Sequence, residues 1–380
     1  MIYLFAKYLE EWLNAHHLGF FRVFTYVTFQ ATASILLSFF LVLLLGPRVI
    51  AWLRLQKIGD TANFDQAEVN AMMASKKGTP TMGGILIVSS IAVTVLLLAD
   101  LQNFFVRVGL LCLLIVAAIG AVDDWLKLTA GRRTGSRQGL ASTEKLLFQV
   151  GLAVIISFFV HRHGAAIAER NLFYLPFFKD LTIKLGLFSF VLIGTIVLTG
   201  TSNAVNLTDG LDGLASGCMA IVSFAFMILA IVLSDKELAP KLFFAYIQGS
   251  DQMAVLAGAM TGACLGFLWH NANPAAVFMG DTGSLALGAL IGYIAIVIRQ
   301  EVMLFIMGGI FVAEAVSVMI QVGYFKYSRR KYGEGRRIFL MAPLHHHFQR
   351  KGWSENQVVV RFWLITAMLA AMALATVKLR

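Results

Sequence analysis

Long apolar stretches, each separated from the next by a short polar segment, dominate the pattern of this chain. A helix that crosses a bilayer needs about 20 consecutive and mostly apolar residues. Ten stretches meet this description, at residues 21–46, 79–98, 104–122, 146–162, 186–203, 211–233, 249–269, 284–298, 302–325 and 358–378. The eighth is short and the second has a glycine pair near its start, so nine or eleven spans are the alternatives. The pattern predicts an all-α, polytopic integral membrane protein.

The remainder of the chain adds little to this architecture. Neither a repeat with a period of 20–50 residues nor a soluble domain longer than a loop is visible, so residues 1–380 are predicted to form a single membrane domain. Residues 1–20 are interrupted by Glu10 and Glu11 and lack a small-residue cleavage site. We therefore expect an amphipathic surface segment and not a cleaved signal. Three cysteines lie within apolar stretches, which indicates buried thiols and not disulfides: Cys112, Cys218 and Cys264.

Charge gives this architecture an orientation. The chain is 58% hydrophobic and 14% charged, with a net charge of +10. More than half of the 31 Lys and Arg residues lie in the loops at 47–78, 123–145 and 326–357, which follow odd-numbered spans. Cytoplasmic loops carry such an excess, so these loops are predicted to be cytoplasmic and both termini periplasmic. Membrane topology and contact with anionic lipid explain the basic excess. Nucleic-acid binding is disfavoured, because the charges are divided among loops and no recognition module is visible.

Polar clusters occupy five of the gaps between spans, and the span count places all five on one membrane face. They are Lys76 to Gly84, Asp123-Asp124, Asn206 to Gly213, Asn271 to Gly283, and His345 to His347. A transporter would place ionisable groups near the bilayer midplane, where only Glu314 is a clear candidate. The arrangement favours an enzyme that takes one substrate from water and another from the lipid.

Asp123 and Asp124 directly follow the third apolar stretch. Two adjacent carboxylates repel each other unless a cation or a shared proton relieves them. A divalent ion is the usual relief, and it would be Mg²⁺ where phosphates are handled. The alternative is a solvated helix end with Lys127 as a local partner.

The segment from Asn206 to Gly213 reads Asn-Leu-Thr-Asp-Gly-Leu-Asp-Gly. Its glycines let backbone approach a ligand, while Asn206, Asp209 and Asp212 offer amide and carboxylate groups to hydroxyls or a metal. A calcium EF-hand is excluded because the ligand alternation and the closing glutamate are absent. A helix cap accounts for one aspartate but not for all three polar positions.

Asp281 lies between Gly280 and Thr282, just before the eighth span, and is a third candidate metal carboxylate. Phe278 offers a stacking face for a base, and Asn271 lies upstream. The alternative is that Asp281 is an ordinary turn residue.

The remaining clusters are rich in hydrogen-bond donors. Lys76 to Gly84 has the donors and glycines that a phosphate site needs, but its lysines precede the glycines, so it is not a Walker A loop. Juxtamembrane lysines before a glycine-rich helix start are the alternative.

Neighbouring helical residues point about 100° apart, so the His345 to His347 run is predicted to contact phosphate or sugar and not to chelate one ion. Glu314, inside the ninth span, is predicted to make a structural polar contact.

Together these motifs resemble the phospho-N-acetylmuramoyl-pentapeptide transferases, in order and over most of the chain. The aspartate pair and the Asn-Xaa-Xaa-Asp-Gly-Xaa-Asp-Gly pattern are shared by the wider group of polyprenyl-phosphate sugar-1-phosphate transferases. The Gly-Thr-Pro-Thr-Met-Gly-Gly run at 78–84 and the triple histidine are more specific to the muramoyl branch. A sibling that transfers N-acetylglucosamine-1-phosphate usually lacks the triple histidine and is the nearest alternative.

The resemblance implies transfer of phospho-N-acetylmuramoyl-pentapeptide from its UDP carrier to undecaprenyl phosphate, giving lipid I and UMP in peptidoglycan synthesis. It implies Mg²⁺ as cofactor, a homodimer, and an active site facing the cytoplasm from the bacterial inner membrane. The implied catalytic residues are Asp123, Asp124, Asp281 and His345. The three aspartates are the implied metal ligands, with Asp281 the principal one. The implied substrate-binding residues are Lys76, Asn206, Asp209, Asp212, Asn271, Phe278 and His346.

Overall fold

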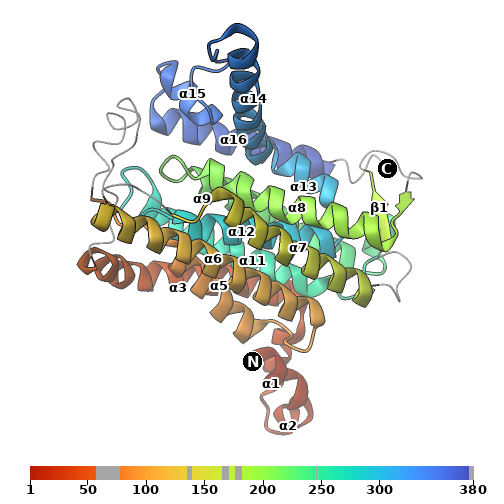
Figure 1. Cartoon of the computed structure of the whole chain (residues 1–380). Coiled ribbons are helices and arrows are strands. Elements are labelled where there is room, and N and C mark those ends of the chain that lie inside the picture. Colours follow the sequence, from red (N-terminus) through yellow and green to blue (C-terminus); the bar gives the residue numbers. More distant parts are fainter. Residues whose placement is uncertain are drawn as a thin grey trace.

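The computed structural model describes residues 1–56, 78–134, 139–164, 171–175, 182–242, 244 and 246–375. The chain forms a bundle of long helices, most of them roughly aligned (Figure 1). In chain order the main helices are α3 (Val27–Leu55), α5 (Gly84–Leu98), α6 (Phe104–Thr134), α7 (Ser142–Gly164), α8 (Leu187–Thr208), α9 (Leu214–Ser234), α11 (Asp251–Asn271), α12 (Gly280–Val297), α13 (Glu301–Met307), α14 (Gly309–Tyr332) and α16 (Glu355–Ala375).

Shorter elements lie at the ends of the bundle. The N-terminal segment comprises α1 (Ile2–Tyr8), α2 (Glu10–Ala15) and the 3-10 helix η1 (Gly19–Thr25), and α1 and α2 project from the bundle (Figure 1). The others are α10 (Leu238–Lys241), α15 (Leu344–Arg350) and an antiparallel pair of strands, β1 (Leu172–Tyr174) and β2 (Thr182–Lys184). The all-α prediction is confirmed, with this one short hairpin as an addition.

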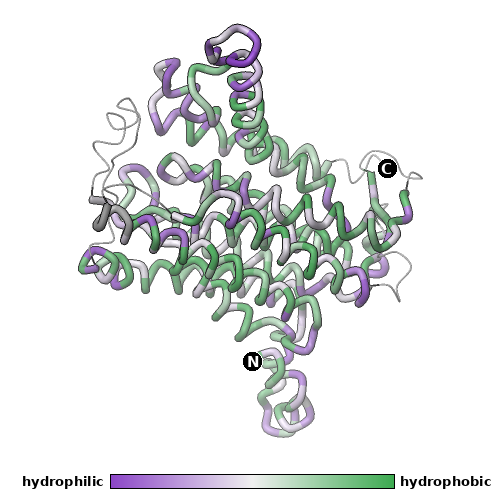
Figure 2. Tube along the Cα trace, viewed as in Figure 1, coloured by the Kyte–Doolittle hydropathy of each residue, from purple (hydrophilic) through white to green (hydrophobic). Residues whose placement is uncertain are grey.

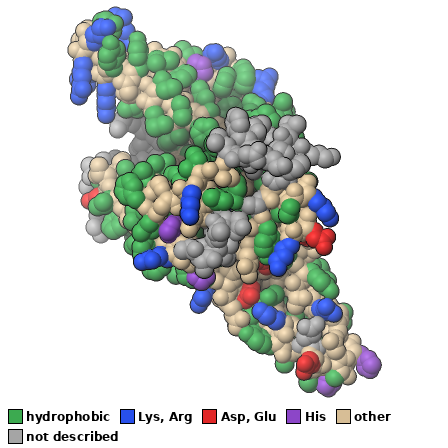
Figure 3. Space-filling model, turned by 90° about the vertical axis from the view of Figure 1, so that its right-hand side faces the viewer, with side chains coloured by type: hydrophobic (Ala, Val, Ile, Leu, Met, Phe, Trp, Pro, Cys, Tyr) green, Lys and Arg blue, Asp and Glu red, His purple; other side chains and the backbone are tan. Residues whose placement is uncertain are grey.

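Nine helices in the described ranges are long and apolar enough to cross a membrane. The second predicted span is the helix α5, which has only 15 residues. Hydrophilic residues gather near helix ends while the lengths between them are apolar (Figure 2). Apolar side chains cover much of the surface in Figure 3, and Lys and Arg gather at its upper end, where α14 stands in Figure 1. These features confirm the polytopic membrane fold.

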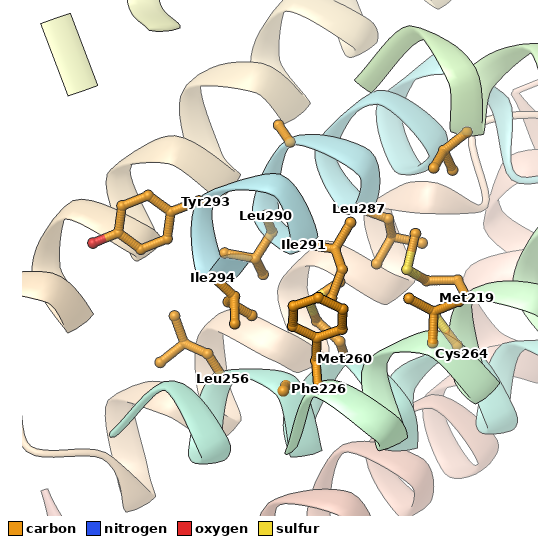
Figure 4. Close-up of a cluster of buried hydrophobic side chains, with 14 of the residues drawn as sticks. Met219, Phe226, Leu256, Met260, Cys264, Leu287, Leu290, Ile291, Tyr293 and Ile294 are labelled. Atoms are coloured by element: carbon orange, nitrogen blue, oxygen red, sulfur yellow. The ribbon is translucent and has the colours of Figure 1, made fainter. Parts of the chain in front are cut away.

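The helix α12 forms the centre of the bundle, because nearly all of its residues are buried, and α9 and α11 are the next most buried. Side chains from these three helices, among them Phe226, Met260 and Ile291, pack together in the core (Figure 4). By contrast, fewer than a third of the residues in α3, α7 and α14 are buried. The motif-bearing first turn of α12 therefore belongs to the best-packed helix of the bundle.

Close packing of α11 on α3 depends on three glycines spaced four residues apart. A Cβ atom at Gly258 would lie 2.6 Å from the Ala31 carbonyl oxygen, and at Gly266 it would lie 2.8 Å from that of Phe39. At Gly262 it would overlap the Ile35 carbonyl oxygen. Such small-residue stripes let the backbones of membrane helices approach each other closely.

Three predicted boundaries were wrong. The ninth span, predicted at 302–325, is broken: α13 ends at Met307, α14 begins at Gly309, and α14 turns away from the bundle (Figure 1). The glycine pair at the break lowers helix propensity. The third span continues as helix to Thr134, so Asp123 and Asp124 lie within α6 and not beyond its end. The eighth begins at Gly280, which puts Asp281 in the first turn of α12.

Candidate active site

Asp123 of α6 and Asp281 of α12 lie side by side where these two helices cross. Asp123 is 1% exposed and Asp281 is 9% exposed. The crossing is close because α6 has a glycine there: a Cβ atom at Gly120 would overlap the Asp281 carbonyl oxygen and lie 2.7 Å from the Thr282 nitrogen. The first helical turn of α12 is therefore held against α6, one turn before the aspartate pair.

Two lysines bridge these aspartates. Lys127 Nζ lies 2.8 Å from Asp123 Oδ2 and 3.0 Å from Asp281 Oδ2. Lys145 Nζ, from α7, lies 3.1 Å and 2.7 Å from the same two oxygens. The two carboxylate oxygens thus face a common point, which two ammonium groups share. We call Asp123, Asp281, Lys127 and Lys145 the carboxylate–lysine cluster.

Asp124 points to a different place from its neighbour. Its Oδ1 accepts a hydrogen bond from the Asp281 nitrogen at 3.1 Å, and its Oδ2 accepts from the nitrogen and hydroxyl of Thr282 at 2.9 and 2.7 Å. A carboxylate that accepts from the first N–H groups of a helix satisfies donors that have no partner within the helix. The structure therefore gives Asp124 the role of holding the start of α12, and its predicted role as a metal ligand stays a prediction.

The end of α8 supplies the next residues. Asn206 Nδ2 donates to Asp281 Oδ1 at 2.7 Å and to Ser284 Oγ at 2.9 Å, which fixes the rotamer of Asp281. Asp209 is half-buried in the turn that follows α8. Burial, reinforced by the nearby carboxylates of Asp281 and Asp124, raises the pKa of Asp209 to about 7. Asp209 therefore lies near the carboxylates of the site, and its predicted contact with the substrate stays a prediction.

Asp212 and Asn271 brace the loops around the site. Asp212 Oδ2 accepts from Asn273 Nδ2 at 3.0 Å and from the Ala275 nitrogen at 3.1 Å. Asn271 is buried; its Oδ1 accepts from the Gly213 nitrogen at 3.0 Å, and its Nδ2 donates to the Val277 oxygen at 2.9 Å. These bonds engage both ends of the Asn271 amide, which favours a bracing role. A nucleotide contact by either residue stays a prediction.

The glycine-rich segment that begins at Gly78 docks against the start of α12. The Phe278 nitrogen donates to the Pro80 oxygen, and the Gly83 nitrogen donates to the Phe278 oxygen, both at 2.8 Å. The Gly84 nitrogen donates to the Met279 oxygen, also at 2.8 Å. Phe278 is half-buried, and its predicted stacking on a base stays a prediction. Lys76, the predicted phosphate contact of this motif, lies outside the described residues.

The three consecutive histidines point to different partners, as the helical geometry predicted. His345 is 1% exposed and its backbone nitrogen donates to Glu314 Oε1 at 3.1 Å. Its ring lies against Gly210, where a Cβ atom would come within 2.8 Å of Cε1. His346 Nδ1 lies 2.9 Å from Gln349 Oε1, whereas His347 Nδ1 accepts from the Leu340 nitrogen at 3.1 Å.

Consequently Glu314 makes the structural polar contact that was expected of it. This contact fastens α15 to α14, and through Gly210 the histidine run meets the loop that contains Asp209 and Asp212. The structure thus brings together residues from all five predicted clusters, apart from the lysines of the first.

Alanine substitutions should separate the roles of the histidines. His345→Ala is expected to lower kcat at least about tenfold, because its ring is the part of the run that lies against the Asn206–Gly213 loop. His347→Ala is expected to lower the melting temperature more than kcat, because its ring accepts a backbone hydrogen bond. The measurements are turnover and thermal unfolding for each variant. If activity follows stability in both variants, these histidines are scaffold alone.

The residues present fit a magnesium ion. Mg²⁺ prefers oxygen ligands and is usually bound by one or two carboxylates together with substrate phosphates. Asp123 Oδ2 and Asp281 Oδ2 are two such oxygens, and in this structure both face the ammonium groups of Lys127 and Lys145. In the part of the chain that the structure describes, no three His, Cys, Asp or Glu side chains are grouped around a single ion position. Magnesium at this place stays a prediction, and phosphate oxygens would have to supply the further ligands.

The sequence reasoning missed two residues of the site. The sequence indicates Lys127 only as a local partner of the aspartate pair, and Lys145 lies at the end of the basic loop at 123–145. The spacing of Lys127 four residues after Asp123 was the available signal, since such residues are neighbours on one helix face. No comparable signal existed for Lys145, because its partners lie 22 and 136 residues away in the sequence.

Comparison with known proteins gives results in agreement with this geometry. Residues 106–299 match the model of glycosyl transferase family 4. Residues 76–88 match signature 1 of the phospho-N-acetylmuramoyl-pentapeptide transferases. The chain is similar to a phospho-N-acetylmuramoyl-pentapeptide transferase from Desulfotalea psychrophila, with 46% identity over 360 residues, which cover 95% of this chain and 96% of the relative.

Proposed function

This chain belongs to the phospho-N-acetylmuramoyl-pentapeptide transferases of glycosyl transferase family 4, and we propose that it catalyses the reaction for which that family is named. In this reaction phospho-N-acetylmuramoyl-pentapeptide passes from UDP to undecaprenyl phosphate, giving lipid I and UMP. The observation that carries the proposal is the carboxylate–lysine cluster at the end of a membrane helix bundle. A site at the end of such a bundle suits a reaction between a phosphate on a lipid and a nucleotide from water.

The charges of the cluster suit phosphoryl transfer. An oxygen of the lipid phosphate attacks the β-phosphorus, the bond from that phosphorus to the bridging oxygen breaks, and UMP leaves with the bonding electrons. Negative charge must be neutralised and the reactants positioned during this step. Lys127 and Lys145 offer positive charge beside the aspartates, and Asn206 holds Asp281 in place. Mg²⁺, when bound, supplies further positive charge toward the diphosphate.

We propose direct attack by the lipid phosphate and not a covalent aspartyl intermediate. Asp123 Oδ1 accepts from the Leu140 nitrogen at 2.7 Å, and its Oδ2 is paired with two ammonium groups. Oxygens stabilised in this way are weak nucleophiles. The second pKa of a phosphate is about 6, so the lipid phosphate is largely ionised at neutral pH and needs little base catalysis.

A transfer assay in detergent tests the function. The protein is offered polyprenyl phosphate with radiolabelled UDP-N-acetylmuramoyl-pentapeptide or, separately, UDP-N-acetylglucosamine. Label should enter the organic phase only from the muramoyl substrate. A chelator should abolish transfer and added Mg²⁺ should restore it. Transfer of N-acetylglucosamine phosphate would instead indicate the sibling activity, and transfer that resists chelation would contradict the magnesium proposal.

We further propose that the protein acts as a homodimer in the bacterial inner membrane, with its site facing the cytoplasm. Family membership supports the dimer, and the basic loops support the orientation. A cysteine replacing exposed Glu334 should react with an impermeant thiol reagent only after cells are opened. A cysteine replacing exposed Lys184 should react in intact cells. The three native cysteines are buried and should remain unlabelled. Labelling at position 334 in intact cells would reverse the proposed orientation.

A further inference from the structure

The helix α7 supplies Lys145 to the site, although it is one of the least buried helices of the bundle. Lys145 lies in its first helical turn. The next three residues are exposed on the outer face of the helix, with Leu147 71% and Phe148 59% exposed. Apolar contact with lipid does not determine how such a helix is rotated about its own axis, because lipid tails interact with every apolar face alike. Something else must direct Lys145 toward the aspartates.

Gln149 lies one turn after Lys145, on the same face of α7. It is 4% exposed, and it joins α7 to α8 through two hydrogen bonds. Gln149 Nε2 donates to Ser202 Oγ at 3.1 Å, and Gln149 Oε1 accepts from Asn203 Nδ2 at 2.8 Å. Both ends of the amide are thus held by neighbouring residues of one helix.

The contact continues into the centre of the bundle. Ser202 Oγ donates to the Leu285 oxygen of α12 at 2.9 Å, and Asn203 Nδ2 also donates to the Thr199 oxygen at 2.8 Å. Leu285 lies one turn after Asp281, the residue that Lys145 contacts. The same end of α12 therefore determines the position of Asp281 and, through Ser202 and Gln149, the rotation of α7.

We infer that Gln149 is a positioning residue, which orients α7 so that Lys145 reaches Asp123 and Asp281. The expected effect of Gln149 on activity rests on the proposed function, whereas its effect on the position of Lys145 does not. Without the two hydrogen bonds, only the packing further along α7 holds its first turns in place, and a small cavity lined by Gln149, Leu152 and Thr199 offers room for them to move. A displacement of about 1 Å in a charged group costs up to about a hundredfold in rate.

The first test compares two substitutions on α7. Gln149→Met keeps the size of the side chain and removes both hydrogen bonds, and it should lower kcat about tenfold with little change in the KM for the UDP-sugar. Ile156→Val, on the same buried face two turns later, is the matched control. Ile156→Val should lower the melting temperature about as much as Gln149→Met does, while its kcat stays near that of the unmodified protein. An equal effect of both variants on kcat would overturn the inference.

The second test asks whether Gln149 acts through Lys145. Gln149→Met should cost about tenfold in the unmodified protein but less than about twofold in a Lys145→Met background, because residues that act as a unit are not additive. An undiminished loss in both backgrounds would overturn the inference.

A third measurement does not depend on activity. Lys145 should react with an amine-specific reagent several times faster in Gln149→Met than in Ile156→Val, as measured by peptide mapping. Equal labelling would contradict the positioning role. If the unmodified protein fails to transfer the muramoyl substrate, the proposed function is contradicted. The labelling comparison still tests the role of Gln149 in that case.

Discussion

Asp281→Asn should lower turnover at least about a thousandfold, which corresponds to about 4 kcal/mol of activation free energy. Asp281 Oδ2 lies within 3.0 Å of both lysines, and its Oδ1 accepts from Asn206. An amide in its place removes the negative charge that both ammonium groups share and one of the two oxygens that suit a magnesium ion. Asp123→Asn and Asp124→Asn should each cost at least about tenfold. The measurement is kcat at saturating substrates and Mg²⁺.

The matched control for this substitution is Asp235→Asn. Asp235 follows α9 and accepts from the nitrogens of Glu237 and Leu238, at 2.8 and 2.9 Å, so Asp235→Asn likewise replaces a hydrogen-bonded carboxylate by an amide. Its partners among the described residues belong to its own turn and not to the carboxylate–lysine cluster, so Asp235→Asn should retain near-normal turnover. Near-normal turnover of Asp281→Asn itself would disprove the assignment of Asp281.

Gly120→Ala should lower kcat about a hundredfold, although residue 120 carries no functional group. The added methyl would overlap the Asp281 carbonyl oxygen and lie 2.7 Å from the Thr282 nitrogen. Both are backbone atoms at the start of α12, so they cannot rotate away, and α6 must move from α12. That movement separates Asp123 from Asp281. Overpacking of this kind should also cost about 1–3 kcal/mol in the free energy of unfolding.

Gly200→Ala provides the comparison for Gly120→Ala. It is also a helical glycine, in α8, but nothing lies within 4 Å of its added Cβ atom. Both substitutions raise helix propensity equally, so the difference between them isolates the crossing of α6 and α12. Turnover and thermal unfolding should be measured for both variants. Equal turnover would mean that the separation of these helices does not determine activity.

The membrane fold could be predicted because it depends on a property that is local in the sequence. A bilayer requires apolar stretches of sufficient length, so hydropathy alone located the nine long apolar helices of the described ranges and the short α5. Helix ends are not determined in this way. Asp281 lies inside α12 because Asp124, 157 residues earlier in the chain, accepts from its nitrogen and stabilises the first turn. A contact across that separation leaves no periodic signal.

The same limit applies to the roles of adjacent residues. Asp123 and Asp124 look equivalent in the sequence, yet neighbouring side chains on a helix point about 100° apart. Asp123 therefore faces the lysines, whereas Asp124 faces the start of α12. Motif reasoning found the pair and its metal-suited chemistry, but only the packing of α6 on α12 distinguishes the two residues.

The glycine stripe on α11 also constrains how this chain can diverge in evolution. Gly258, Gly262 and Gly266 lie deep among the helices and away from the carboxylate–lysine cluster, yet each faces α3 backbone too closely to admit even a methyl group without a shift. Descendant sequences can exchange lipid-facing residues of the outer helices with little penalty, because one apolar side chain serves there as well as another. Along α11, small residues must instead be retained at every fourth position. Positions that change slowly in evolution therefore need not all belong to the active site.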